Sequence, residues 1–274
     1  MDYVFPEQPT WHQRQRELHE LIQQYTLMSD LFMSTVLADK KACQHVLRII
    51  LRDPALVVRD VVVQKTMTQL YGKSSRLDVT AEDGKGRLLN VEVQNQPEKN
   101  FARRLRFYSG VMVSQFLSRG DDYNKLPDQI MIYISSSDIW KKGLVLYEFQ
   151  MTERATGLLA GDGLKHIYVN TEIDDGSAIA KLMQYFKTAD PLDQSQGALS
   201  EQVNYYKTDQ EGLTIMCEIC EKLRNDGRAE GRAEGIAASN IQYAKKLAAK
   251  GMPLDEIAQI AETDVATVKH WLEM

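Results

Sequence analysis

Residues 76–94 alternate apolar and polar positions in two short runs, which the turn sequence Asp-Gly-Lys-Gly at 83–86 separates. Alternation with a period of two indicates half-buried strands, and a glycine-rich turn between two such runs predicts a β-hairpin. On one face of the hairpin we expect the apolar residues Leu77, Val79, Ala81, Leu89, Val91 and Val93. The opposite face then carries Asp78, Glu92 and Gln94.

The register of this hairpin decides which polar side chains meet. If the loop is 84–86, Asp83 pairs with Arg87, and Asp78 lies opposite Glu92. Two carboxylates that face each other across antiparallel strands repel. A divalent cation would offset the repulsion, because Mg²⁺ prefers one or two carboxylates together with substrate phosphate oxygens. A solvated strand face with acidic residues is the alternative, and the spacing alone leaves both open.

Helical and strand patterns on both sides of the hairpin predict a mixed α/β domain. The expected elements are helices within 11–51, a strand at 57–64, the hairpin at 75–95, a helix at 98–118, strands at 129–135 and 166–170, a helix at 178–190 and a loop at 190–200. We expect Ser29 and Asp30 to cap a helix that begins next to Leu31. Elements in this order form one core sheet that helices cover.

The helix expected at 98–118 brings positive charge next to the hairpin. Residues 99–119 contain no acidic residue and five basic ones: Lys99, Arg103, Arg104, Arg106 and Arg119. Helical spacing places Arg104 and Tyr108 on one face, together with Val111 and Gln115. The whole chain, in contrast, has a net charge of −5. Dedicated nucleic-acid binders are usually basic, so only this local segment favours DNA binding.

The composition is that of an ordinary globular protein of 274 residues, 43% hydrophobic and 26% charged. This length allows a sizeable core and an appendage. No apolar run approaches the roughly 20 residues of a membrane span. The N-terminus lacks the basic start and apolar core of a secretory signal, so we expect a cytoplasmic protein.

Three cysteines, Cys43, Cys217 and Cys220, are too few for a disulfide framework. Cys217 and Cys220 have zinc-type spacing, but no second Cys or His pair follows at finger-like spacing. We therefore favour semi-buried positions on a helix over a metal site.

The segment 227–235 repeats the unit Gly-Arg-Ala-Glu and ends on a third glycine. Each glycine costs about 1 kcal/mol relative to alanine inside a helix, which allows a flexible linker. Arginine, alanine and glutamate form helices readily, and the glycines would then make a stripe that another helix can approach. We favour the helix with an interaction role.

The C-terminal residues 254–271 have the pattern of a helix-turn-helix, with Ala258, Val265 and Val268 at packing positions. The usual turn glycine is absent, and Glu262-Thr263 stands in its place. Residues 239–274, which include this pattern, carry four lysines and five acidic residues, unlike a typical DNA reader. We favour a packing or oligomerisation unit over a DNA-reading one.

The carboxylate hairpin belongs to a longer ordered pattern. Its parts are Arg76-Leu-Asp78, Asn90-Val-Glu92-Val-Gln94, Phe101-Ala-Arg-Arg104 with Tyr108, and Gly120-Asp-Asp-Tyr123 before the strand at 129–135. The pattern resembles the PD-(D/E)XK nuclease family transposases, also called the recombination-promoting nuclease family. The resemblance includes the opening Ser29-Asp-Leu-Phe-Met33 and the Gly-Arg-Ala-Glu repeats, and covers most of residues 26–272. It is specific from Arg76 to Tyr123 and loose at the C-terminus.

This resemblance implies an α/β fold with a restriction-endonuclease-like core, in which helices flank a mixed central sheet, and metal-dependent cleavage of DNA. Asp78 and Glu92 would be the ligands of Mg²⁺ or Mn²⁺. A bound divalent ion can help to deprotonate a water and stabilise the leaving oxygen. Arg104 and Tyr108 would lie on the helix beside the site, and the planar fork of Arg104 suits a phosphate.

Gln94 occupies the position that is lysine in the wider superfamily, where the resemblance makes it the third catalytic residue. Glutamine can orient a water or complete coordination, but it supplies no positive charge. An amide at this position recurs within the family, so it does not itself predict inactivity. Lys73 and Arg76 lie nearby in sequence, and Arg76 is equally consistent with a cross-strand salt bridge. The expected substrate contacts are Arg76, Arg103, Arg104 and Tyr108.

We divide the chain into a nuclease-like domain at 1–205, a helical linker with the repeats at 206–238, and a small helix-turn-helix-like unit at 239–274. The expected function is that of a DNA endonuclease in recombination or in defence against mobile DNA, with DNA and further copies of the chain as partners. The alternative is a catalytically silent nuclease fold that acts as a DNA-binding or oligomerising regulatory module. A transcription regulator built on 254–272 would leave the hairpin and the basic helix without a purpose.

Overall fold

A six-stranded mixed sheet forms the centre of the protein, whose computed structural model describes residues 11–67, 75–96, 99–114 and 116–273. The strands are β1 (Val58–Met67), β2 (Ser75–Asp83), β3 (Leu88–Gln94), β4 (Gln129–Ser135), β5 (Leu146–Phe149) and β6 (Leu164–Asn170). Their order is β1-β2-β3-β4-β6-β5. β3, β4 and β6 run parallel, whereas the other pairs are antiparallel.

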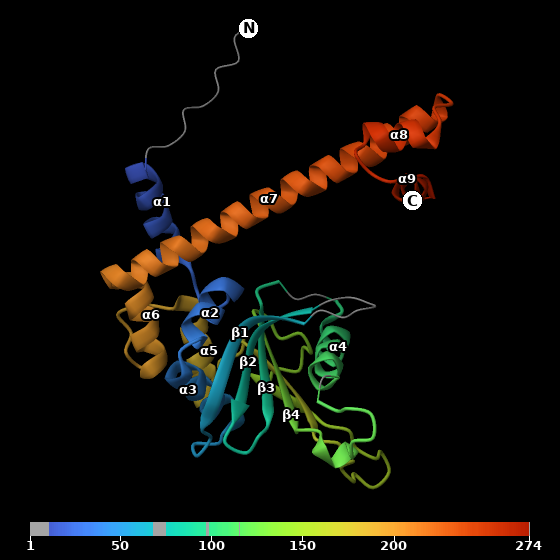
Figure 1. The fold of residues 1–274 in the computed structure, drawn as a ribbon. Coiled ribbons are helices and arrows are strands. Elements are labelled where there is room, and N and C mark those ends of the chain that lie inside the picture. Colours follow the sequence, from blue (N-terminus) through green and yellow to red (C-terminus); the bar gives the residue numbers. More distant parts are fainter. Residues whose placement is uncertain (1–10, 68–74, 97–98, 115, 274) are drawn as a thin grey trace. The chain divides into compact units, whose positions relative to one another are not determined.

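Helices cover both faces of this sheet, as the sequence predicted. The helices of the described residues are α1 (Trp11–Gln24), α2 (Asp30–Leu37), α3 (Lys40–Leu51), α4 (Phe101–Val113), α5 (Ala178–Thr188), α6 (Ala198–Thr208), α7 (Gln210–Ala249), α8 (Leu254–Ile260) and α9 (Val265–Glu273), with a short 3-10 helix at Tyr123–Lys125. α2 and α3 pack against β1, and α4 packs against β2 and β4 from the other side (Figure 1). The predicted mixed sheet with flanking helices is confirmed.

The register of the β2–β3 hairpin is the one that the sequence predicted. Val79 pairs with Val91, and Ala81 pairs with Leu89. At the turn, the backbone N–H of Asp83 donates to the carbonyl of Arg87 at 3.1 Å. Gly86 takes a φ of 75°, the left-handed conformation that glycine adopts without strain. The glycine-rich turn therefore fixes which residues of the two strands face each other.

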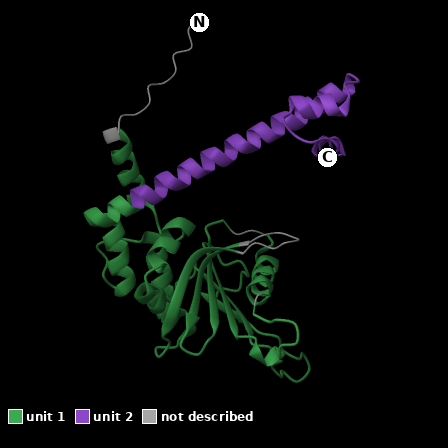
Figure 2. Ribbon diagram, in the orientation of Figure 1, with its two compact units in different colours: residues 1–215 green, residues 216–274 purple. Residues whose placement is uncertain are grey.

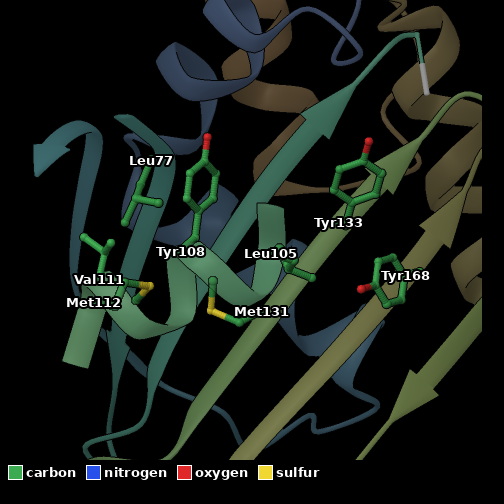
Figure 3. Packing of buried hydrophobic residues seen from close by; sticks show 8 residues of the cluster. All are labelled: Leu77, Leu105, Tyr108, Val111, Met112, Met131, Tyr133 and Tyr168. Atoms are coloured by element: carbon green, nitrogen blue, oxygen red, sulfur yellow. The ribbon is translucent and has the colours of Figure 1, made fainter. Parts of the chain in front are cut away.

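Leu77 does not lie where strict alternation places it. It belongs to the buried cluster that includes Leu105 and Tyr108 of α4 (Figure 3), on the side from which α4 also approaches Glu92. The partner strand is irregular at this point, because Gln64 has a φ of 50° and falls between the regular pairs of β1 and β2. The left-handed Gln64 interrupts the alternation of side chains at this point. The prediction that Leu77 shares a face with Val79 and Ala81 is therefore wrong.

Two elements were absent from the expected order. They are β5, a strand of only four residues, and α6. The expected loop at 190–200 ends where α6 begins, at Ala198. Ser29 does stand at the N-cap of α2, but its side chain makes no capping hydrogen bond; the Oδ1 of Asp30 accepts one from the N–H of Leu31 instead.

The chain divides into two compact units, residues 1–215 and 216–274 (Figure 2). α7 runs as one continuous helix of 40 residues through the glycine repeats, so the helix is confirmed and the flexible linker is wrong. Side chains at 222–238 are exposed throughout. The division at 205 and 238 remains a prediction.

A small helical core forms in the second unit from Ala244, Ile257, Ala258 and Val268. Ala258 and Val268 are thus buried as expected, whereas Val265 is exposed. Glu262, in the place of the usual turn glycine, takes a left-handed φ of 51°. In the described ranges, none of the helices carries an apolar stretch of the length that a bilayer crossing requires.

Candidate active site

The two carboxylates predicted to face each other lie where the pairing of β2 and β3 ends. Beyond the last pair, Val79 and Val91, side chains take the place of backbone partners. The backbone N–H of Asp78 donates to Oε1 of Glu92 at 3.1 Å, and the backbone N–H of Val93 donates to Oδ2 of Asp78 at 3.2 Å. Each carboxylate thus satisfies a backbone donor of the neighbouring strand, and the hairpin itself holds the two acids together.

Glu92 is almost fully buried, with 1% of its side chain exposed. Its Oε1 also accepts a hydrogen bond from Nδ2 of Asn90 at 3.0 Å. Its Oε2, in contrast, has no hydrogen-bond partner among the residues that the structure describes. The nearest described cation is the Nη2 of Arg104, 3.8 Å from Oε2. A buried carboxylate oxygen without a donor is costly, so this atom is suited to accept a ligand from outside the chain.

Burial weakens the acidity of both carboxyl groups. The pKa of Glu92 rises to about 8, first because burial disfavours the charged form and then because the Asp78 carboxylate repels it. The pKa of Asp78 rises to about 6, again mainly through burial. Arg104 opposes both rises, and Arg76 opposes that of Asp78. The pair therefore holds less negative charge than two exposed acids would, until a cation joins it.

Arg104 links α4 to this pair. Its Nε donates to the hydroxyl of Tyr108 at 2.8 Å, one helical turn further along, and its guanidinium carbon lies 5.3 Å from the centre of the Tyr108 ring. The ring of Tyr108 is itself buried in the cluster beneath α4 (Figure 3). The prediction that Arg104 and Tyr108 share a face beside the carboxylates is confirmed, and Tyr108 orients the guanidinium.

The remaining predicted residues surround this centre at different depths. Gln94 ends β3 half-buried, beside Ser135 of β4, and its carbonyl accepts a hydrogen bond from the N–H of Ser136. Arg76 and Arg103 are exposed. Lys73 and Gln115 lie outside the described residues. Asp78, Glu92 and Arg104 are the residues that hydrogen bonds and an ion pair join directly.

The roles of two further residues at this site were not predicted from the sequence. Asn90 holds Oε1 of Glu92, and its position two residues before Glu92 on the same strand was the available indication. Asp30, at the start of α2, raises the pKa of Asp78 by charge repulsion. Nothing in the sequence connects Asp30 to the hairpin, because the fold alone brings α2 against β2 and β3.

The donor set has the chemistry of a hard-cation site. In the described part of the chain, no three His, Cys, Asp or Glu side chains converge as a complete metal cage. Two carboxylates do converge, and one of their buried oxygens lacks a donor. Mg²⁺ is commonly held by one or two carboxylates with waters and phosphate oxygens completing its shell. These residues therefore fit a divalent ion that substrate helps to bind.

A family model described as PD-(D/E)XK nuclease family transposase matches residues 31–214. The chain belongs to this family. No curated protein and no solved structure matches it. The matched range begins in α2, contains the whole sheet of the PD-(D/E)XK core and ends early in α7, so it includes the carboxylate pair, Gln94 and Arg104. Membership supports a nuclease fold with divalent-metal chemistry, which the donor set at Asp78 and Glu92 fits independently.

Proposed function

We propose that this protein is a Mg²⁺-dependent or Mn²⁺-dependent DNA endonuclease that hydrolyses phosphodiester bonds. The observation that carries the proposal is the buried Glu92, whose Oε2 lacks a hydrogen-bond donor while its Oε1 is tied to the backbone of Asp78. A fold that needed only a hydrogen-bond acceptor for the N–H of Asp78 would be served by glutamine, which carries no buried charge. Family membership supplies the reaction class, and this oxygen supplies the reason to retain a carboxylate.

In this proposal Asp78 and Glu92 would hold the metal ion, which would supply Lewis acidity for the activation of water. Arg104 binds a non-bridging phosphate oxygen through its planar guanidinium, which Tyr108 keeps in place. Gln94 orients the attacking water through its amide, since glutamine offers both a donor and an acceptor. The hairpin thus supplies the acids and α4 supplies the cation.

The basic residues of α4 and its flanks would guide DNA to the site. Arg103 and Arg106 are exposed on α4, whereas Arg104 turns towards Glu92. Exposed basic side chains bind phosphates without reading sequence. We therefore assign Arg76 and Arg103 to the DNA backbone, with Arg104 reserved for the reacting phosphate.

Plasmid cleavage tests the enzyme directly. We expect nicking or linearisation that requires Mg²⁺ or Mn²⁺ and disappears in Asp78→Ala and in Glu92→Ala. Glu82→Ala is the matched control, because Glu82 is an exposed acid on the same strand as Asp78. Retained cleavage in both site variants, or equal loss in the control, would contradict the proposal.

Calorimetric titration tests the metal site without DNA cleavage. The parent protein should bind Mg²⁺ or Mn²⁺ measurably more tightly than Glu92→Gln, which removes a charge and keeps the shape of the side chain. Identical titrations would mean that Glu92 is no ligand.

A catalytically silent nuclease fold is the second candidate, and one observation favours it. The guanidinium of Arg104, at 3.8 Å from Oε2 of Glu92, already places a positive charge where a metal ion would neutralise the acid. On this view DNA is retained without metal, and the protein acts as a DNA-binding or regulatory module. Metal-independent DNA retention together with absent cleavage would decide for it.

The C-terminal helices are proposed to join copies of the chain. The support is the exposed stripe of Gly227, Gly231 and Gly235 on α7, where an added Cβ would meet nothing within 4 Å. Deleting 227–274 should dissociate the oligomer while the sheet domain stays folded, as light scattering and circular dichroism would show. A role in recombination or in defence against mobile DNA, and a cytoplasmic location, remain predictions.

A further inference from the structure

A hollow of about 710 Å³ lies at the carboxyl ends of β4 and β6. Its lining includes Lys99 and Phe101 at the start of α4, Asp138 and Lys141 after β4, and Glu172 after β6. The volume is within the range of small-molecule sites. In open α/β sheets, ligands bind at the carboxyl ends of parallel strands, so the location is also that of a binding site.

This hollow adjoins the carboxylate pair through the sheet and through α4. Gln94, two residues after Glu92, lies beside Ser135 in the register of β3 and β4. The next residue, Ser136, donates from its N–H to the carbonyl of Gln94 and from its hydroxyl to the carbonyl of Asn95. On α4, Phe101 precedes Arg104 by one turn. The hollow and the carboxylate pair are thus connected by the end of β3, the residues after β4 and the first turns of α4.

The polar groups of the hollow do not suit a phosphate. Asp138 and Glu172 are both acidic and would repel an anion. Asp138 is also fixed as an anion, because the backbone N–H groups of Lys141 and Gly143 and the hydroxyl of Tyr147 donate to its carboxylate. Hydrogen bonding to the charged form keeps the pKa of Asp138 below its ordinary value, although burial opposes this. The negative charge is therefore permanent near neutral pH.

The same groups suit a nucleobase. Base edges present donors and acceptors together, which match carboxylate oxygens and ammonium groups. Lys99 and Lys141 are exposed and line the hollow, so both ammonium groups can donate to a base edge. Phe101 belongs to an aromatic group in which the Trp140 ring centre is 5.2 Å away and edge-on, and it gives the hollow a rigid apolar wall. Base recognition needs this combination of apolar wall and polar rim.

We propose that this hollow takes an unpaired nucleobase of the strand to be cut, next to the scissile phosphate. A paired base has its edge occupied and its faces stacked, and so cannot enter. Single-stranded DNA, or duplex that is locally opened, is therefore the preferred substrate. The inference rests on the proposed function, because it assumes that DNA occupies the neighbouring carboxylate site.

The lysines of the loop after β4 provide a matched test. Lys141 lines the hollow, whereas the adjacent Lys142, equally exposed, does not. The binding of a short fluorescein-labelled single strand is measured by anisotropy in EDTA, for the full-length parent, Lys99→Met/Lys141→Met and Lys142→Met. The double variant should lose about tenfold or more in affinity, and the control about twofold or less, since only the double variant loses charge-assisted hydrogen bonds to the base. The double variant should lose clearly less affinity for the fully paired duplex than for the single strand, since the duplex loses only the electrostatic contribution of the two charges.

An abasic scan locates the base. Oligonucleotides that lack one base at successive positions should show one position at which affinity falls about tenfold in the parent but not in Lys99→Met/Lys141→Met. A scan without such a position, or with the same loss in both proteins, overturns the inference. Metal-dependent cleavage with a flat scan would overturn the base site alone. Failure to bind any DNA would overturn this inference and the DNA endonuclease together.

Discussion

Oε1 of Glu92 accepts the backbone N–H of Asp78 at 3.1 Å, so the two acids of the site are joined by main chain as well as by charge. The second oxygen of Glu92 is left with Arg104 as its nearest described cation. The two oxygen atoms of this carboxylate therefore have different surroundings. The first accepts a backbone hydrogen bond and ends the pairing of the hairpin, and the second accepts no hydrogen bond from the described residues.

Replacing Arg104 should separate metal binding from cleavage. Arg104→Met removes a cation that competes for Glu92, so we expect Mg²⁺ to bind a few-fold more tightly in the absence of DNA, while cleavage becomes slower because a phosphate contact is lost. Arg103→Met, on the next residue and exposed, is the control for the metal titration. Calorimetry and single-turnover cleavage measure the two effects. Weaker metal binding in Arg104→Met would show that the guanidinium supports the metal site.

The raised pKa of Glu92 makes metal-free stability depend on pH. The folded state binds the proton more tightly than the unfolded state does, so stability falls as the pH rises from about 4.5 towards about 8. Glu92→Gln carries no titrating group at this position. Urea unfolding in EDTA at several pH values should therefore show that the unfolding free energy of the variant rises relative to that of the parent as the pH increases. Parallel profiles for the two proteins would contradict the buried, ionisable carboxyl.

Lys207 should contribute to stability far from the site. It is 3% exposed, and its Nζ donates to the carbonyls of Gln23 and Ala189, at the ends of α1 and α5. Lys207→Met leaves both carbonyls without this donor, which should cost about 1–3 kcal/mol in unfolding free energy. Lys187→Met, at an exposed position on α5, should change it little.

The same lysine predicts an opposite pH trend. Burial lowers the pKa of Lys207 to about 8, so between about 8 and 10.5 the unfolded state binds more protons and the parent becomes more stable with rising pH. The loss caused by Lys207→Met should consequently be larger at pH 10 than at pH 7. Chemical denaturation at the two pH values checks the sign, and an equal loss at both would mean that the ammonium is not desolvated.

Glu262 offers a stabilising substitution. Its φ of 51° is strained for a residue with a side chain, and glycine adopts it freely. We expect Glu262→Gly to stabilise the C-terminal helices by about 1 kcal/mol. Glu256→Gly, inside α8, should destabilise them by about the same amount. Thermal unfolding of the full chain should move in opposite directions for the two variants.

The hairpin shows why part of the site could be predicted from sequence. Alternation and the glycine turn at 84–86 are local, and together they determine that Asp78 meets Glu92. The four-residue spacing of Arg104 and Tyr108 is local in the same way. No local pattern in the sequence indicates the left-handed conformation of Gln64, so the face on which Leu77 lies was predicted wrongly.

The rest of the site depends on contacts between distant segments. The hollow joins Lys99, Lys141 and Glu172, which only the parallel order of β3, β4 and β6 brings together. Burial of Glu92, and with it the rise of its pKa, follows from α4 covering the sheet. Residue spacing and secondary-structure propensity predict neither the hollow nor the burial of Glu92, because these two features arise from packing between distant segments.

The hydrogen bonds between the carboxylates and the strand ends have a consequence for how this protein could lose its activity. Asparagine at 78 and glutamine at 92 would each keep one acceptor oxygen for the backbone donors of Val93 and Asp78. A chain with both changes would lose the two negative charges of the site and keep the hairpin. Under the proposed function, two substitutions would therefore suffice to remove the metal ligands, and the hairpin would keep its backbone hydrogen bonds.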